Sequence, residues 1–517
     1  MQEMKYCSYK YLLFLLLATF LGCGNSRELL VLDDLRTGEP KVIRFKASRT
    51  DITIPTPNLN EEFSLILNSY EDGNLNREIK ISAGLNYSDL LAENPGKELS
   101  PVESRIDPLL RDAEKIAAQA FPGRERLKIN PKFLTDTPPP SADFKVLNNY
   151  VSPENYSSVN AGLVSASPIC AFYADGAIPL PIRNDPWFIP LIQRLESNFD
   201  NIIYPTLKSY FGDEPLVEGI PQIIILMTPV VNMIDTGGRG RVLGFFYAGD
   251  LFPASKFPSS NEARIIYIAA PEESGKEALE KFADQLMTGT LAHEFQHMIN
   301  FNEHVIKDGS SDAEEVWLNE GLSHMAEDIT GFGRGNIGRA GTFLSSPVKY
   351  PLAASNDSLG TRGGAYLFLR YIFEKFDMQN NAGLFRKITS SSYRGTENIS
   401  KSLGIEFSKV YTDWLSTLAI SGRGISGDPY YSYSEPRIIG SDGRAGPFQI
   451  GISIRGENES LTLDGPYTEP FCDVNLKYKP TSASFYSLKA EGKNIIFLTI
   501  VSSDPHSSGM ILIPNRL

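Results

Sequence analysis

Apolar residues at three- and four-residue steps between 279 and 297 restrict this part of the chain to one long helix. The run starts at Leu279 and ends at His293 and His297. Such spacing places these side chains on one helix face, and Ser274 followed by Glu277 is the pattern of a capping box at a helix start. The sequence therefore predicts a helix from about residue 274 that directs two histidines towards the interior.

The two histidines frame the segment His293-Glu-Phe-Gln-His297. Imidazoles four residues apart on a helix can share one metal ion, and Glu294 then lies beside that ion without binding it. A glutamate in this position is typical of a catalytic zinc site, where a base takes a proton from zinc-bound water. Since helices also carry such pairs as ordinary features, the interpretation depends on a third ligand.

A catalytic zinc site needs a third protein ligand, and the next helix offers Glu320. A capping pattern at 311–314 predicts the start of this second helix, and Glu320 and Glu327 fall on one of its faces. Glu327 is placed to accept the outer ring proton of a zinc-binding histidine. The other residues that could supply the third ligand are Glu303, His304 and His324.

Two segments carry a resemblance to a known group of enzymes: HEFQHMINF at 293–301 and WLNEGLSHMAED at 317–328. With this pair the chain resembles the gluzincin metallopeptidases, in which the glutamate of an asparagine-glutamate pair is the third zinc ligand. It is more specifically similar to the hyicolysin-like bacterial peptidases, over about residues 143–376. Two less specific matching segments lie at 204–212 and 244–250.

The resemblance implies Zn²⁺ as the cofactor, held by His293, His297 and Glu320, with Glu294 as the general base. The leading hypothesis is a zinc metalloendopeptidase that hydrolyses peptide bonds with metal-activated water. An aminopeptidase would need an acidic clamp for the free amine, and the chain has no glycine-alanine-methionine-glutamate-asparagine segment of that kind. The remaining alternative is a surface-binding lipoprotein with an inactive peptidase fold.

Gluzincins also use a tyrosine or histidine that donates a hydrogen bond to the oxyanion of the reaction. The matching segment at 360–366 gives no secure counterpart. Arg362, Tyr366 and Tyr350 are therefore candidates for this donor, and a structural role is the alternative for each.

The regions on either side of the two helices contain short β-rich runs, such as 41–45, 63–67 and 495–500. We expect an α+β fold, in which a gluzincin (thermolysin-like) zinc peptidase domain is flanked by N- and C-terminal β-rich domains. The three prolines at 138–140 indicate a linker. The expected order is an N-terminal β-rich domain at 23–100, a helical segment and proline-rich linker at 101–142, the catalytic domain at 143–428 and a C-terminal β-rich domain at 429–517.

The first residues have the pattern of a bacterial export signal. Lys5 and Lys10 precede an apolar run at 11–21, and this run is too short to span a bilayer. The segment 20–23 resembles a lipobox, which implies a signal peptide at 1–22 and lipidation of Cys23. We expect an exported protein, lipid-anchored at Cys23 on the bacterial cell surface or a periplasm-facing membrane; a plain secretory signal is the alternative.

A formal net charge of -13 argues against nucleic acid as a partner, because phosphate binding needs a basic face. The expected partners are protein or peptide substrates, with membrane attachment through the N-terminal lipid only. Of the four cysteines, Cys170 and Cys472 remain once the signal and lipid positions are set aside. In an oxidising compartment they could form a disulfide, and two free thiols are the alternative.

Overall fold

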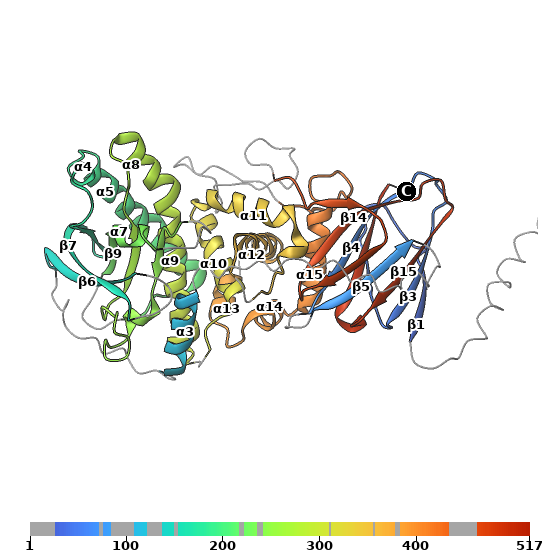
Figure 1. The fold of residues 1–517 in the computed structure, drawn as a ribbon, viewed down its shortest axis with the longest axis horizontal. Helices are drawn as coiled ribbons and strands as arrows, with labels where there is room; N and C mark the ends of the chain where they lie inside the picture. The colour runs from blue at the N-terminus through green and yellow to red at the C-terminus, as the bar shows by residue number, and fades with distance from the viewer. Residues whose placement is uncertain are drawn as a thin grey trace, which may run out of the picture.

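The computed structural model has two regions, with a mixed sheet and helices at one end and a β-sandwich at the other (Figure 1). The helices that follow the mixed sheet in the chain lie between them. The structure describes residues 26–71, 76–83, 108–120, 137–148, 154–216, 222–234, 241–309, 312–354, 357–377, 383–433 and 463–516. The predicted signal peptide, the lipobox and Cys23 lie outside these residues.

The mixed sheet has six strands in the order β10-β11-β9-β8-β7-β6. The central strands β8, β9 and β11 are parallel and buried along their whole length, in keeping with their continuous apolar runs. The short strand β10 forms one edge and pairs antiparallel with β11. The strands are β6 (Ser141–Leu147), β7 (Tyr156–Ala166), β8 (Cys170–Asp175), β9 (Ile223–Thr228), β10 (Gly244–Phe246) and β11 (Ile265–Ala269).

The helix predicted to carry the two histidines packs against β10 and β11. It runs without interruption through α8 (Lys276–Phe282), η5 (Ala283–Met287), α9 (Thr288–Phe301) and η6 (Asn302–Lys307), where η5 and η6 are π-helical turns. The predicted capping box is wrong, because Gly275 occupies the N-cap with φ 103° and no side chain caps the helix. Helices α5 and α7 also contact strands of this sheet. The helical elements of this part of the chain are α4 (Leu180–Arg183), α5 (Phe188–Asn198), η3 (Phe199–Ile203), α6 (Tyr204–Phe211), α7 (Pro229–Asn232) and η4 (Ala248–Leu251).

The second predicted helix is α10 (Val316–Ile329), which packs on both α9 and α12. It begins after the predicted capping segment, because the Glu314 carboxylate accepts hydrogen bonds from Gly395 N and Asn398 Nδ2 instead of capping a helix. The remaining elements of this region are η7 (Gly333–Gly335), α11 (Asn336–Ser345), η8 (Pro347–Lys349), α12 (Leu359–Ile372), η9 (Phe373–Asp377), α13 (Leu384–Thr389), α14 (Gly395–Leu403), α15 (Phe407–Ile420) and η10 (Pro429–Tyr431).

Helix α3 (Pro108–Ala120) packs with the mixed sheet and α9 rather than forming part of a separate linker region. Leu110, Ala113 and Ala117 are buried in the same hydrophobic cluster as the mixed sheet and α9. Three- and four-residue spacing of these small apolar residues gives α3 one inward face. α3 and the first residues of β6, which the sequence prediction placed in the segment 101–142, thus pack with elements of the region expected from residue 143 onwards.

The two β-rich regions form one sandwich, which corrects the expectation of separate N- and C-terminal β domains. One sheet has the order β1-β3-β15-β5-β13 and the other β12-β14-β4-β16-β2, so strands from both chain ends alternate. The strands are β1 (Arg27–Val31), β2 (Lys41–Arg44), β3 (Arg49–Pro55), β4 (Glu62–Ser69), β5 (Arg77–Ala83), β12 (Thr468–Pro470), β13 (Val474–Tyr478), β14 (Ala483–Lys489), β15 (Ile495–Ser502) and β16 (Ser508–Arg516); the turn η11 (Pro505–Ser507) joins the last two.

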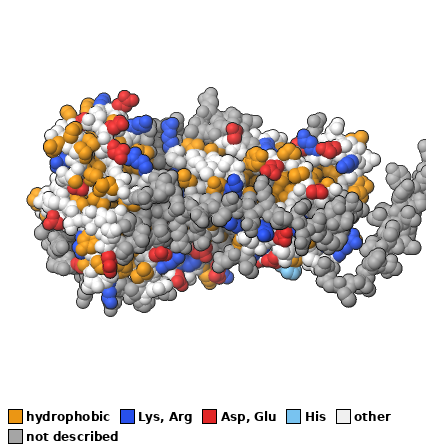
Figure 2. Space-filling model, in the orientation of Figure 1, with side chains coloured by type: hydrophobic (Ala, Val, Ile, Leu, Met, Phe, Trp, Pro, Cys, Tyr) orange, Lys and Arg blue, Asp and Glu red, His pale blue; other side chains and the backbone are white. Residues whose placement is uncertain are grey.

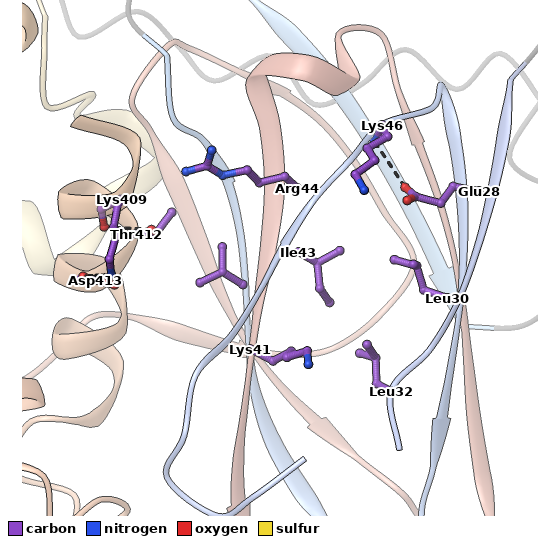
Figure 3. Close-up of a pocket in the computed structure, with 11 residues that line it drawn as sticks. Glu28, Leu30, Leu32, Lys41, Ile43, Arg44, Lys46, Lys409, Thr412 and Asp413 are labelled. Carbon is purple, nitrogen blue, oxygen red and sulfur yellow. Dashed lines mark hydrogen bonds and ion pairs between the residues drawn. The ribbon is translucent and has the colours of Figure 1, made fainter. Parts of the chain in front are cut away.

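A groove of about 480 Å³ lies beside the edge strands β1 and β2, where the sandwich approaches α15 (Figure 3). Leu30, Leu32 and Ile43 line it on the sandwich side. On the edge strand β2, Lys41 Nζ pairs with Asp34 at 2.6 Å. Charges on an edge strand disfavour pairing with a further strand.

The two described cysteines are both free, which corrects the candidate disulfide. Cys170 is buried on β8 of the mixed sheet, where its thiol contacts Asp200 Oδ1 at 3.4 Å, whereas Cys472 is exposed beside β13 of the sandwich. Among the described residues, none of the helices combines the length and apolarity needed to cross a bilayer. On the face shown in Figure 2, the described Lys and Arg side chains are interspersed with Asp and Glu.

Candidate metal centre

Helices α9 and α10 together bring the two histidines and Glu320 to one buried point. His293 and His297 lie one turn apart on the face of α9 that meets α10, and Glu320 faces them from α10. All three side chains are buried although they are polar. Buried polar groups need hydrogen-bond or ionic partners, and a cation at this point would complement the three side chains.

The donor atoms of these residues lie close enough together to bind one ion. The two Nε2 atoms of His293 and His297 lie 3.1 Å apart. Glu320 Oε2 is 3.4 Å from His293 Nε2, and Glu320 Oε1 is 3.5 Å from His297 Nε2. Ligands at about 2.0–2.1 Å from a tetrahedral zinc ion are about 3.3–3.4 Å from one another. The residues therefore fit a zinc ion.

The outer nitrogen of each histidine contacts an oxygen that fixes its tautomer. His293 Nδ1 lies 2.8 Å from Glu327 Oε1, and His297 Nδ1 lies 3.0 Å from Asn319 Oδ1. The sequence predicted Glu327 as the partner of one of the two histidines without indicating which. Since both oxygens accept, each Nδ1 donates, and each Nε2 presents its lone pair to the centre. Asn319 was not predicted; the available signal was its place immediately before Glu320.

The charges of the centre favour a bound cation. Burial lowers the pKa of His293, but hydrogen bonds to Glu320 and Glu327 outweigh it and raise the pKa to about 9, so a metal ion that binds Nε2 has to displace a proton from this ring. Burial also raises the pKa of the Glu320 carboxyl, yet the Arg362 guanidinium and the two histidines hold it well below its usual value. Glu320 therefore stays ionised near neutral pH, as an anionic metal ligand must.

Glu294 lies beside the centre and is oriented by the edge strand β10. Its Oε2 accepts a hydrogen bond from Phe246 N at 2.9 Å. Gly244 allows this approach: a Cβ there would lie 2.6 Å from Thr290 Cγ2 and 3.6 Å from Glu294 Cγ. Helix α9 and strand β10 thus hold the Glu294 carboxylate beside the metal centre, in the place expected for a general base.

The alternative third ligands at the end of the first helix face other partners. Glu303 Oε1 accepts from Asp213 N and Lys307 Nζ, both at 2.7 Å. His304 Nδ1 contacts Ser391 O at 3.1 Å. These contacts turn both side chains towards α6 and α14, so neither joins the donor group of His293 and His297.

His324 lies closer to the centre and forms a second donor group with His293 and Glu327. Its Nδ1 is 2.8 Å from Glu327 Oε1, the same oxygen that meets His293 Nδ1. Burial lowers the pKa of His324 to about 3, so its ring is neutral. His324 thus lies beside Glu327, next to the Nδ1 side of the His293 ring rather than the Nε2 side.

The structure separates the three candidate oxyanion donors. Arg362 is nearest the centre, with Nη1 3.2 Å from Glu320 Oε2 and its other nitrogens donating to Asp357. The Tyr366 hydroxyl is fully buried and donates to Asp328 Oδ2 at 2.9 Å, which gives it a structural role. The Tyr350 ring covers Gly360 at the start of α12.

No protein-family model matches the chain. A neutral metalloprotease, ShpI of Staphylococcus hyicus, is 24% identical to it over 229 residues. The aligned part is 41% of this chain and 48% of the relative, so the chain spans about half the length of the curated relative it matches. Together with the buried histidine and glutamate group, this partial similarity supports a place for the chain among the metallopeptidases.

Proposed function

We propose that the chain is an exported zinc metalloendopeptidase of the hyicolysin-like gluzincin type. The observation that carries the proposal is the convergence of His293 Nε2, His297 Nε2 and Glu320 close enough together to bind one ion, with Glu294 held beside them. The partial similarity to a neutral metalloprotease points to the same chemistry.

His293, His297 and Glu320 would hold the ion and leave its fourth position for water or substrate. A bound zinc ion would acidify that water and polarise the substrate carbonyl. Glu294, oriented by the amide of Phe246, accepts the proton from the attacking water and passes it to the departing amine. Arg362 contacts Glu320 and, of the three candidate oxyanion donors, is the one that touches a residue of the metal centre.

The experiment that tests the function is hydrolysis of a broad library of N-terminally blocked peptides, read by mass spectrometry with and without a chelator. Internal cleavage that disappears with the chelator and returns with zinc is the expected result. Cleavage only of peptides with free amino termini would indicate an aminopeptidase. A folded, zinc-loaded protein that leaves the whole library intact would indicate a surface-binding lipoprotein without catalysis.

We also propose export with lipid attachment at Cys23, for which the support is the charged start, the apolar run and the lipobox-like segment. Cys23→Ser should abolish acylation and release a soluble form, because two or more acyl chains make attachment stable. Detergent partitioning of both forms and the mass of the N-terminal peptide measure this. Equal partitioning, with no lipid mass on the unmodified sequence, would count against the anchor.

A further inference from the structure

Helix α3 carries a buried carboxylate to the outer side of the metal centre. Glu114 is 3% exposed, and its Oε2 lies 3.2 Å from Asn319 Nδ2. α3 precedes the mixed sheet in the chain by a long segment, yet its apolar face is part of the same core. The other described buried residues on this face of α3 are apolar. A carboxylate buried among them needs a specific polar partner, which Asn319 supplies.

The contact decides which way the amide of Asn319 points. Asn319 Oδ1 accepts from His297 Nδ1 at 3.0 Å and from Asn300 Nδ2 at 2.5 Å, while its Nδ2 donates to Glu114. A flipped amide would place its oxygen against the Glu114 carboxylate, so that two acceptors would meet. Glu114 thus favours the one orientation in which Asn319 accepts from His297.

The orientation of the Asn319 amide in turn determines which ring nitrogen of His297 carries the proton. Because Asn319 offers an oxygen, His297 must carry its proton on Nδ1, which leaves the Nε2 lone pair directed towards His293 and Glu320. We propose that Glu114 is a positioning residue for the metal centre, acting through Asn319 on His297. This inference rests on the proposed zinc function and adds α3 to the elements that zinc binding requires.

A merely structural role for Glu114 predicts a different pattern of effects. If Glu114 only holds α3 in place, its loss lowers the stability of the fold. Any effect on zinc affinity would then be the same with and without the Asn319 amide. If it acts through Asn319, removing it from a protein that already lacks the Asn319 amide changes zinc affinity no further. A double-mutant cycle separates these cases.

The test uses the full chain and measures zinc affinity by competition with a chromophoric chelator. The variants are Glu114→Met, which keeps volume but accepts no hydrogen bond, Glu114→Ala, Glu114→Gln, Asn319→Ala and the double variant Glu114→Met with Asn319→Ala. Asp112→Asn removes a carboxylate from the same helix and serves as the charge control. Each variant is compared by thermal melting, and the visible spectrum of the Co²⁺-loaded protein reports ligand geometry.

Loss of a histidine's outer partner typically weakens metal binding by about 10- to 100-fold, which is the expectation for Asn319→Ala. Glu114→Met acts one step further out and should weaken zinc binding by about 3- to 10-fold with an altered Co²⁺ spectrum. Glu114→Gln, which can still accept, and Asp112→Asn should bind zinc as the unmodified chain does. The double variant should match Asn319→Ala alone.

Unchanged zinc affinity in folded Glu114→Met or Glu114→Ala would overturn the inference, as would additive losses in the double variant. If one of these two variants does not fold, the other and the Gln comparison still decide. Because these readouts need no hydrolysis, failure here leaves the peptidase assignment standing. An unmodified chain that binds no zinc would overturn both the inference and the proposed function.

Discussion

Buried carboxylates in this protein differ in ionisation because their neighbours differ. Glu320 faces Arg362 and Glu327 faces two histidines, and these neighbours hold both carboxyl pKa values low although burial acts in the opposite direction. At Asp250, on η4, burial prevails: its pKa rises from 3.8 to about 7 because hydrogen bonds from Tyr267 and Asn261 offset only part of the desolvation. The carboxylates of the metal centre thus keep their charge, whereas the Asp250 carboxyl on η4 is held closer to its neutral form.

Replacing Asp250 by Asn should therefore change how stability depends on pH. A carboxyl whose pKa is raised on folding binds a proton more tightly in the folded state, so its contribution is present below pH about 4 and is lost as the pH rises to about 7. Over that window the unmodified chain should lose stability relative to Asp250→Asn by up to about 1.4 kcal/mol per pH unit. Urea unfolding of both proteins at pH 5 and pH 8 measures the difference, and a pH-independent difference would contradict the shift.

At the scale of elements, the position of Glu320 depends on close packing of α10 and α11 against α12. A Cβ on Gly321 would lie 2.8 Å from Leu369 Cδ1, and a Cβ on Gly363 would lie 2.0 Å from the backbone oxygen of Arg339. Glycine at these points lets the helix axes approach, so that α12 can carry Arg362 to Glu320. Neither glycine has the positive φ of a turn, so packing is the reason for both.

Gly363→Ala should destabilise the protein by about 1–3 kcal/mol or more, because the added methyl meets backbone that cannot rotate away. The matched control is Gly338→Ala on α11, where a Cβ meets nothing within 4 Å. That change should be neutral or stabilising by about 0.5–1 kcal/mol, since alanine favours the helix. Thermal unfolding at one scan rate compares the three proteins; equal losses for both variants would refute the packing account.

The sequence predicted these helices better than their ends and contacts. The period of apolar residues sufficed for α9 and α10, and the common face of Glu320 and Glu327 indicated Glu327 as a partner of one zinc histidine, which the structure shows to be His293. The start of α10 was wrong because Glu314 bonds to α14, a partner distant in sequence. Glu114 and Phe246 could not be predicted as neighbours of the centre for the same reason: local patterns carry no information on which distant segments meet.

At the scale of the whole molecule, the chain leaves the sandwich after β5, forms the catalytic core and returns to complete the same two sheets. β15 lies between β3 and β5, and β4 lies between β14 and β16. The strand runs were predictable from alternation, whereas the pairing across more than 400 residues was not, as in the ladder that joins Leu65 to Leu512. Both ends of the chain are therefore needed to close this unit.

Removal of residues 463–517 should unfold the N-terminal strands as well. β4 would lose both of its neighbours and β5 would lose β13 and β15, which exposes apolar faces that the sandwich buries. Trypsin should then cleave rapidly after Arg77, which is buried in the complete protein, while the core from β6 to α15 stays resistant. A protease-resistant fragment of residues 26–83 from the truncated chain would contradict the single sandwich and favour two separate domains.

The central claim concerns two glutamates near the same donor atoms, with Glu294 as the base and Glu320 as a ligand. The most direct measurement is zinc content after dialysis for Glu294→Gln and Glu320→Gln in parallel, with peptidase rates at each zinc level. Glu294→Gln should keep about one zinc per chain while hydrolysis falls by several orders of magnitude, because both proton transfers are lost. Glu320→Gln should lose zinc together with activity, and excess zinc should restore part of the rate. If Glu320→Gln instead retained zinc as the unmodified chain does while Glu303→Gln lost it, the ligand set proposed for this centre would be wrong.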